Sequence, residues 1–287
     1  MHAMDGSPGT IESVEPLVRR VLAPNPSAFT YSGTQTFIVG TGAVAVIDPG
    51  PDLPEHVEAL LAALKDETIA AILCTHTHRD HSPAAALLQA ATGAPIIGCA
   101  ALTMDDEGPR ADAAFDAEYL PDRVLADGEG LEGEGWTLEA VATPGHTSNH
   151  LCFALPESGA LFSGDHVMGW STTIVSPPDG DMADYMESLE KLQARDDRIY
   201  YPAHGPAIER PKRLVRGMIG HRRQREGQIL RRLREGSGFI PDMVASMYKG
   251  IDPRLHGAAG RSVLAHLIDL ETRGLVARQG EGWSLAA

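Results

Sequence analysis

The sequence predicts an α/β fold, a four-layer αββα sandwich followed by a small C-terminal α+β module of winged-helix type. Three observations predict it. Short apolar runs with many β-branched residues alternate with helical patterns as far as residue 199, and histidines and aspartates follow several of these runs directly. The sign of the charge also changes near residue 210. We therefore divide the 287-residue chain into a larger domain, residues 1–209, and a C-terminal domain, residues 210–287.

The elements of the larger domain follow from the pattern of apolar residues. Residues 36–39 and 43–48 are short apolar runs typical of strands, and residues 54–65 begin with proline and continue as a helix. Further strands are expected at residues 69–74, 136–142, 160–162 and 199–201. Because strands and helices alternate, we expect sheets whose outer faces are covered by helices.

A run of residues directly after one predicted strand carries ligands for a metal ion. Residues 75–81 read Thr-His-Thr-His-Arg-Asp-His. On an extended backbone, residues two apart project to the same side, so His76 and His78 can hold one cation together. A serine and a proline then begin a helix, and the loop before it turns Asp80 and His81 back toward the first two histidines. The run predicts a metal site, and its four ligands favour a double one.

Three more ligand-type residues lie in equivalent settings. His146, Asp165 and His204 each follow a strand-like run and stand beside glycine or proline, where a rigid sheet passes into a loop. Any one of these pieces alone is usually a turn whose polar side chain caps its own backbone. Their occurrence together, in this order after residues 75–81, favours metal binding by all seven residues.

This arrangement resembles the metallo-β-lactamase superfamily, in which a His-x-His-x-Asp-His motif is followed by a histidine, an aspartate and a histidine. The resemblance covers about residues 15–210 and holds at every position of the pattern. It implies that residues 1–209 are a catalytic domain with two metal ions. It also implies the ligand set, with His76, His78 and His146 on the first metal, Asp80, His81 and His204 on the second, and Asp165 bridging both.

The ligand types indicate which metals to expect. Imidazole and carboxylate groups suit zinc, which we expect first, and they also accept iron or manganese. The expected cofactors are therefore two divalent metal ions. The three cysteines, at residues 74, 99 and 152, lie in apolar stretches and are expected to be buried thiols that bind no metal.

Two differences from known branches of the superfamily narrow the range of reactions that we expect this chain to catalyse. The best-known β-lactamases carry a cysteine where Asp165 stands, which argues against β-lactam hydrolysis. The flavodiiron proteins carry a carboxylate where His78 stands and an attached flavin domain, and this chain has neither. Hydrolysis of a small ester, thioester or lactone is therefore the expected reaction.

The expected chemistry follows from the two metals. As a hypothesis, a hydroxide shared by the ions is the nucleophile, because metal binding lowers the pKa of water from about 15.7 to about 7. Asp80 is the one residue to which we assign a catalytic role besides ligation, because it can orient the attacking water. The substrate is expected to be a small molecule.

The charge is divided unevenly between the two domains. Through Glu209 there are 9 Lys and Arg against 32 Asp and Glu, a net −23, and from Arg210 onward there are 15 against 7, a net +8. Ten of these basic residues lie in one predicted helix between Arg210 and Arg234. Its apolar residues Leu214, Met218, Ile229 and Leu233 would face the protein and leave Arg222, Arg223, Arg225, Arg231 and Arg232 outward. A solvated basic helix is slightly favoured over a surface that binds a polyanion.

The last fifty residues predict a small winged-helix module. Helices are expected at residues 241–245 and 260–273, and strands at 275–279 and 283–285 flank a Gly-Glu-Gly turn. This tail, together with the metal-binding pattern, is similar to the LACTB2-like branch of the superfamily, which includes endoribonucleases that cleave single-stranded RNA. An endoribonuclease that binds RNA through the basic C-terminal region is therefore the alternative function. Winged helices also form homodimer contacts or walls of a substrate gorge.

Composition excludes some classes of protein. No apolar run approaches the length of about 18 residues that a membrane-spanning helix needs, so we expect no membrane partner. Residues 1–7 lack the basic and apolar regions of a secretory signal, and three cysteines do not suggest a disulfide framework. We therefore expect a cytoplasmic enzyme.

The remaining histidines and two long connections complete the expectations. His150 and His166 each neighbour a ligand, so they are candidates for a supporting or substrate-contacting role. The histidines at residues 2, 56, 221, 256 and 266 are expected to be solvated or packed. The acidic segment 105–134 is expected to be a surface excursion, with a lid over the metals as the alternative. Residues 170–181 follow Asp165 closely and are a candidate wall of the pocket.

Overall fold

The computed structural model describes residues 6–103, 115–252 and 255–286 of the chain. Its elements in chain order are β1 (Ile11–Glu15), β2 (Val18–Leu22), β3 (Gln35–Val39), β4 (Ala43–Ile47), α1 (Pro54–Ala63), β5 (Thr68–Cys74), α2 (Ala84–Thr92), β6 (Ile96–Gly98), β7 (Arg123–Val124), β8 (Gly130–Gly133), β9 (Trp136–Ala142), β10 (Leu151–Leu155), β11 (Ala160–Gly164), α3 (Met182–Ala194), β12 (Ile199–Pro202), α4 (Pro211–Arg234), α5 (Ile240–Met247), α6 (His256–Thr272), β13 (Val276–Gln279) and β14 (Gly282–Leu285).

Two sheets form the centre of the larger domain. The first has the order β1-β2-β3-β4-β5-β6-β7, antiparallel as far as β4 and parallel from there on. The second has the order β12-β11-β10-β9-β8, in which only β11 and β12 are parallel. Parallel neighbours end at the same edge of a sheet, so the loops after β4 and β5 begin side by side, as do the loops after β11 and β12.

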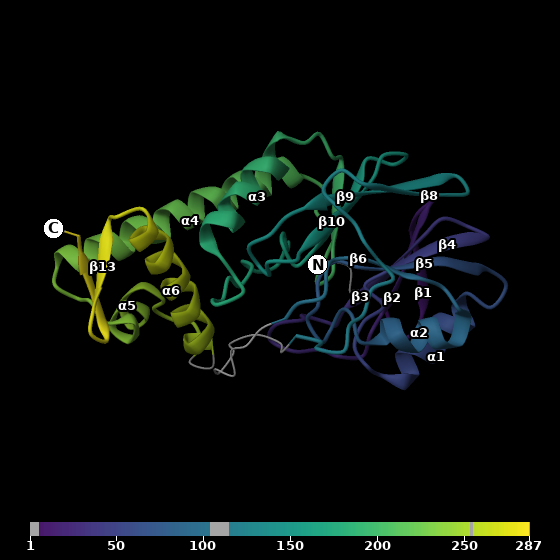
Figure 1. The fold of residues 1–287 in the computed structure, drawn as a ribbon, viewed down its shortest axis with the longest axis horizontal. Coiled ribbons are helices and arrows are strands. Elements are labelled where there is room, and N and C mark those ends of the chain that lie inside the picture. The colour runs from purple at the N-terminus through teal and green to yellow at the C-terminus, as the bar shows by residue number, and fades with distance from the viewer. Residues whose placement is uncertain (1–5, 104–114, 253–254, 287) are drawn as a thin grey trace.

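The sheets pack face to face, and helices cover their outer faces (Figure 1). Successive residues of β11 show why, because they point to opposite faces. Phe162 lies in the core between the sheets, 5.2 Å from the Phe37 ring, whereas Leu161 packs with Tyr185 of α3 and Val215 of α4. On the other side, α1 and α2 pack against the first sheet. The predicted four-layer αββα sandwich is confirmed.

The pattern of apolar residues did not predict β1 and β2. Charged residues interrupt the apolar positions of both strands, and their side chains form ion pairs over the sheet edge. Arg20 of β2 contacts Glu12 of β1 at 2.8 Å, and Arg19 contacts Glu67 at 2.5 Å. β1 lies at the edge of the sheet and β2 beside it, and both are partly exposed, so they carry little apolar signal and a sequence pattern detects them poorly.

The start of α2 also differs from the prediction. We expected the serine at residue 82 to cap this helix, but its hydroxyl donates to Asp116 Oδ2 at 2.9 Å. The helix begins at Ala84, after Pro83. Of the segment 105–134, predicted to be a surface excursion or a lid, residues 105–114 lie outside the described residues, and the remainder includes the short strands β7 and β8. Within the described ranges, no helix is both long and apolar enough to cross a membrane.

The C-terminal module is the predicted winged helix. Its helices α5 and α6 and its antiparallel strands β13 and β14 enclose a separate core that includes Val263, Leu267 and Trp283. Helix α4 belongs to two cores, because Val215 packs with the second sheet while Ile229 packs in the module. The boundary that we predict between residues 209 and 210 falls just before this shared helix.

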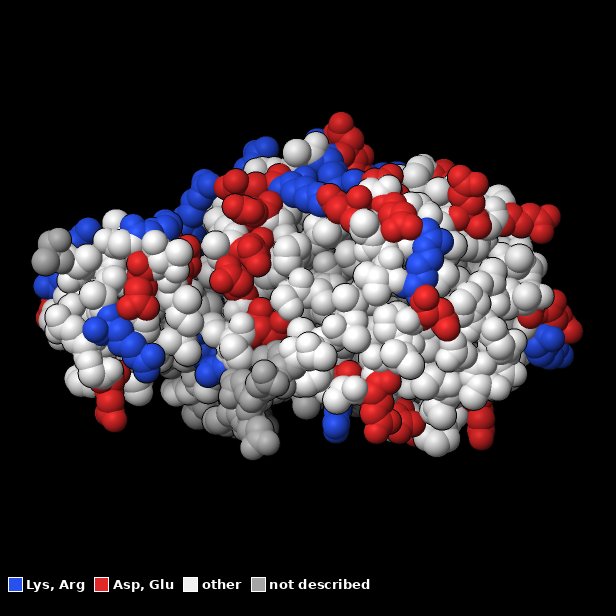
Figure 2. Space-filling model, in the orientation of Figure 1, with Lys and Arg blue, Asp and Glu red and all other residues white. Residues whose placement is uncertain are grey.

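The prediction that five arginines of α4 point outward was wrong in part. Arg223 and Arg231 are exposed, but Arg222 is only 4% exposed. Arg225 and Arg232 are half-buried, and Arg225 donates to the Met247 carbonyl at 3.0 Å and lies over the Tyr248 ring. Apolar spacing does not reveal such contacts, because long basic side chains also pack. Figure 2 shows basic side chains along the edge that α4 follows in Figure 1.

Candidate metal centre

The seven predicted ligands meet where four strands end. β5 ends one residue before the run 75–81, and β11 ends one residue before Asp165. β9 and β12 end a few residues before His146 and His204. The strands β5 and β11 belong to different sheets, so the ligands of both sheets face one another across this edge of the sandwich.

The last residue of β11, Gly164, must be a glycine. Gly164 has a φ of +49°, and a Cβ at this position would lie 2.6 Å from His150 Nε2 and 2.8 Å from Thr75 Oγ1. No other residue fits this close approach of the two sheets. The glycine therefore lets the Asp165 carboxylate reach the histidines of the first sheet.

Three histidines form a first group. The Nδ1 atom of His78 lies 3.1 Å from His76 Nε2 and 3.2 Å from His146 Nε2. The three nitrogens lie within 4.8 Å of one another, and all three rings are buried. Three imidazole nitrogens gathered in this way are one half of the predicted arrangement.

A second group combines a carboxylate with two histidines. Asp80 Oδ2 lies 3.2 Å from His204 Nε2 and 3.7 Å from His81 Nε2. These three ligand atoms also lie within 4.8 Å of one another. The loop of residues 75–81 thus contributes to both groups, as its position between a strand and a helix suggests.

Asp165 stands between the two groups. Its Oδ1 atom lies 3.4 Å from His204 Nε2 and 3.6 Å from His81 Nε2. Its Oδ2 atom lies 3.7 Å from His146 Nε2. Each oxygen of the carboxylate therefore faces one group, so the structure brings all seven predicted residues together.

Several buried atoms at the centre make no hydrogen bond. They are Asp80 Oδ1, His81 Nε2, Asp165 Oδ1 and His204 Nε2. A buried polar atom without a partner is costly, and such atoms are rare unless they bind a ligand. Lone pairs of imidazole and carboxylate that converge in this way fit divalent metal ions.

Groups behind the rings select the nitrogen that faces the centre. The Nδ1 atom of His146 donates to the Ile174 carbonyl at 2.7 Å, and that of His204 donates to the Gly33 carbonyl at 3.2 Å. A carbonyl can only accept, so these nitrogens carry hydrogen and leave Nε2 with a free lone pair. His76 Nδ1 is held in the same way by Thr75 Oγ1, at 3.0 Å.

Asp48 fixes the nitrogen that His81 turns toward the centre in the same way. We did not predict this role of Asp48 from the sequence. Its Oδ2 atom accepts from His81 Nδ1 at 3.0 Å and from Thr75 Oγ1 at 2.8 Å, while Oδ1 accepts from the Thr75 backbone N–H at 2.8 Å. Asp48 follows β4, the parallel neighbour of β5. A carboxylate at the end of a strand beside the ligand-bearing strand was the signal that could have identified it.

The acidic and basic groups of the centre shift one another's pKa values. Burial lowers the pKa of His78 to about 3, with a further contribution from His146. Burial also opposes charge on His81, but Asp80 and Asp165 outweigh it and raise the pKa of this ring well above its usual range. The same carboxylates raise the pKa of His204. Metal ions would therefore compete with protons for these two rings.

Two further histidines support the centre. His150 Nδ1 contacts Thr143 Oγ1 at 2.9 Å, and its Nε2 accepts from the backbone N–H of Asp165 at 3.2 Å. His166 is fully buried against the Tyr185 ring, at 4.6 Å between ring centres. Both lie behind the ligands, which favours the supporting role over contact with substrate. The three cysteines are buried and free, as predicted.

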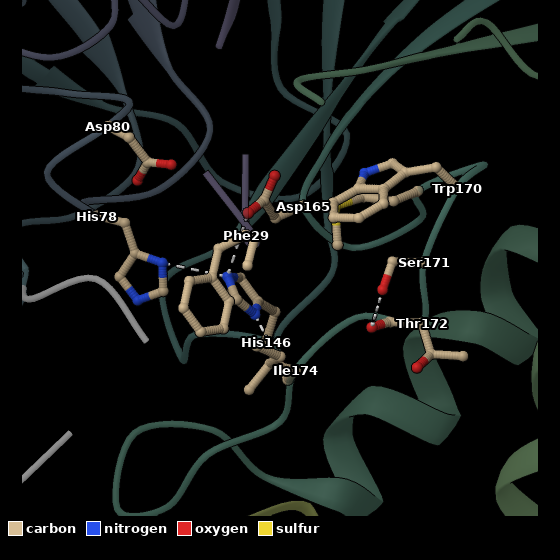
Figure 3. Close-up of a pocket in the computed structure, with 11 residues that line it drawn as sticks. Phe29, His78, Asp80, His146, Asp165, Trp170, Ser171, Thr172 and Ile174 are labelled. Carbon is tan, nitrogen blue, oxygen red and sulfur yellow. Dashed lines mark hydrogen bonds and ion pairs between the residues drawn. The ribbon is translucent and has the colours of Figure 1, made fainter. Parts of the chain in front are cut away.

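A pocket opens from the centre toward solvent (Figure 3). His78 and Asp80 lie on one side of it, and Trp170 lies on the other. Phe29 stands at the opening and is 39% exposed. The segment predicted as a pocket wall contributes four lining residues, which are Trp170, Ser171, Thr172 and Ile174. Among the described residues that line the pocket, none is a lysine or an arginine, and several are apolar or aromatic.

The chain matches the models of two protein families. A model described as the metallo-beta-lactamase superfamily matches residues 29–204, and a beta-lactamase associated winged helix domain matches residues 240–283. The chain therefore belongs to the metallo-β-lactamase superfamily, and it is a hydrolase of the branch that carries a C-terminal winged helix. Both the sequence resemblance and the predicted module are confirmed.

Individual relatives agree with this assignment. An atrochrysone carboxyl ACP thioesterase of Aspergillus fumigatus is 37% identical over 226 residues, which cover 77% of this chain but only 66% of the relative. A beta-lactamase-like protein 2 homolog of Drosophila melanogaster is 35% identical over 272 residues, covering 90% of this chain and 88% of the relative. A solved beta-lactamase domain protein from Burkholderia ambifaria has a TM-score of 0.79 at 19% identity, covering 99% and 96% of the two chains, and shows the same fold.

Proposed function

We propose that this protein is a dinuclear metal-dependent hydrolase that cleaves a small thioester, ester or lactone, with a thioester first. The observation that carries the proposal is the position of Asp165, whose two oxygens face the two ligand groups. In the proposed assignment, His76, His78 and His146 hold one ion, Asp80, His81 and His204 hold the other, and Asp165 bridges them. The ligand types favour zinc, with iron or manganese as alternatives.

The bound ions would supply a hydroxide near neutral pH and polarise the scissile carbonyl. The side chains of the chain itself orient the reactants. Asp80 lines the pocket, and its Oδ1 atom makes no hydrogen bond, so it is placed to accept a hydrogen bond from the attacking nucleophile and orient it. We therefore keep Asp80 as the catalytic residue.

The pocket favours an apolar acyl group on a thiol. Phe29, Met168 and Trp170 form an apolar wall, and no cation lies among the described lining residues to bind a phosphate. Those residues also include no evident proton donor for a leaving group. A thiolate leaves without a proton, whereas an alkoxide or an amine needs one. The thioesterase named among the relatives supports the same substrate class.

A panel of substrates tests the proposal. We expect the zinc-loaded or manganese-loaded protein to hydrolyse an acyl thioester, a chelator to abolish turnover, and added metal to restore it. Replacement of the proposed catalytic residue, Asp80→Asn, should lower kcat by about 100-fold or more, which also excludes a contaminating enzyme. Lactones, a phosphodiester and single-stranded RNA complete the panel. Cleavage of RNA with no thioester turnover would contradict the proposal and favour the endoribonuclease.

The basic C-terminal region is the feature that keeps the endoribonuclease as the second candidate. Part of its charge is neutralised, since Arg223 pairs with Glu190 at 2.8 Å and Arg273 with Glu226 at 2.5 Å. RNA contacts with phosphate depend steeply on salt. A salt titration of a short single-stranded RNA therefore tests this alternative, and lack of binding at low salt removes it.

A further inference from the structure

A buried arginine of α4 reaches the loop that carries one proposed ligand, Asp165, and orients another, His146. Arg222 was expected on the solvated face of the basic helix, yet it is almost fully buried. Its Nη2 atom donates to the carbonyl of Thr173, and its guanidinium lies 5.0 Å from the centre of the Tyr185 ring. No carboxylate among the described residues pairs with it. A buried cation without an acidic partner is costly, so a specific contact must offset that cost.

The partner of Arg222 is the residue that ties this loop together. Thr173 Oγ1 donates to the Asp165 carbonyl at 2.8 Å and to the His166 carbonyl at 3.0 Å. Tyr185 Oη donates to the same His166 carbonyl at 3.1 Å. The backbone that follows Asp165 is thus fastened at both ends, and the carbonyl of Thr173 is the point at which α4 holds it.

The next residue of the loop orients a ligand of the other group. The Ile174 carbonyl accepts from His146 Nδ1 at 2.7 Å, and Thr173 holds the Asp165 carbonyl, so the position of residues 173 and 174 is coupled to both His146 and Asp165. A hydrogen bond from a charged donor is about twice as strong as a neutral one. Arg222 is therefore able to fix this peptide in place from outside the centre.

We propose that Arg222 is a positioning residue that holds segment 165–174 so that Asp165 and His146 face the metals. The inference rests on the proposed metal centre and extends it, because it makes metal binding depend on the docking of α4. Helix α4 also belongs to the core of the winged-helix module. The inference therefore links the packing of the module to the geometry of the metal site. Arg222 itself touches neither metal nor substrate.

Metal titrations of four variants test the inference. Arg222→Met removes the donor, and Arg222→Lys keeps the charge but loses the planar geometry of the guanidinium. Arg223→Gln is the matched control on the solvent side of the same helix, and Ile219→Ala is a control for loss of packing, because Ile219 is buried in the core that α4 shares with the second sheet. Affinity is measured by competition with a chromophoric chelator, and the visible spectrum of the Co²⁺-loaded protein reports the ligand geometry.

We expect Arg222→Met to weaken the binding of at least one ion about 10- to 100-fold and to change the Co²⁺ spectrum. Arg222→Lys should recover part of the affinity, and both controls should bind as the original chain does. If Arg222→Lys and Arg222→Met bind both ions with unchanged affinity and spectrum, the inference is wrong while the proposed centre stands. Equal weakening in Ile219→Ala also overturns it, because the effect would then be loss of packing. Absence of metal binding in the original chain overturns the centre itself, and the inference with it.

Discussion

At the scale of single residues, the centre depends on the groups behind its rings. The seven residues of the proposed ligand set, which the structure brings together, could be predicted because their residue types and their places after strands are visible in the sequence. The partners that fix the rings could not all be predicted. The Ile174 and Gly33 carbonyls are backbone atoms, which every residue has, so no residue type marks them. Asp48 was the exception that a closer comparison of neighbouring strands could have revealed.

Replacement of Asp48 by asparagine should disable His81 as a ligand. The amide nitrogen would stand where Oδ2 now accepts from two donors, so His81 Nδ1 would have to give up its hydrogen and Nε2 would carry it instead. We expect Asp48→Asn to weaken one metal site by about 10- to 100-fold and to leave the group around His78 less affected. Isothermal titration of the metal-free protein measures both sites.

Asp52 provides the control for this experiment. It is exposed just beyond the same strand, so Asp52→Asn should bind both ions normally. Equal affinity of Asp48→Asn and the original chain at both sites would show that Asp48 does not orient His81.

At the scale of elements, apolar patterns predicted several of the buried strands and the long helix α4, but not the buried strands β6 and β10 or the helix α3. β9 was predicted with its observed bounds, and α4 was predicted from Pro211 to Arg234. The edge strand β1 and its neighbour β2 were missed because charged pairs occupy their partly exposed positions. Helix α6 begins four residues earlier than predicted, at His256, since its first turn carries few of the apolar residues by which the pattern was recognised.

A buried histidine of α6 should make the winged-helix module sensitive to acid. Burial, with Arg222 and His221, lowers the pKa of His266 to about 3, below its ordinary value of 6.5. The ring is neutral in the folded chain but gains a proton in the unfolded chain below pH 6.5, so its contribution to stability is present above that pH and is lost as pH falls toward 3. The loss is about 1.4 kcal/mol per pH unit, or about 2 kcal/mol between neutral pH and pH 5.

Urea unfolding of the metal-free protein at pH 7 and pH 5 measures this loss. His266→Leu should reduce the difference in unfolding free energy between the two pH values by about 2 kcal/mol. His256 lies exposed on the same helix, so His256→Leu should leave the difference unchanged. An unchanged difference in His266→Leu would show that His266 does not cause the acid sensitivity.

At the scale of the whole molecule, two sheets form the larger domain and helix α4 joins this domain to the winged-helix module. The fold could be predicted because alternating strands and helices allow few architectures, and because the ligands mark the edge where the sheets meet. The role of α4 could not be predicted, because its composition indicated only a basic surface. The contact of Arg222 with Thr173 joins segments far apart in the sequence, and such a contact appears only once the chain has folded.

The number of ions that the chain binds tests the central claim most directly. Native mass spectrometry of the zinc-loaded protein should show two ions per chain, because the ligand atoms form two groups with Asp165 between them. The variant Asp165→Ala should retain one ion or none. A chain that binds no zinc, or an Asp165→Ala variant that keeps both ions at the original affinity, would contradict the proposed dinuclear centre.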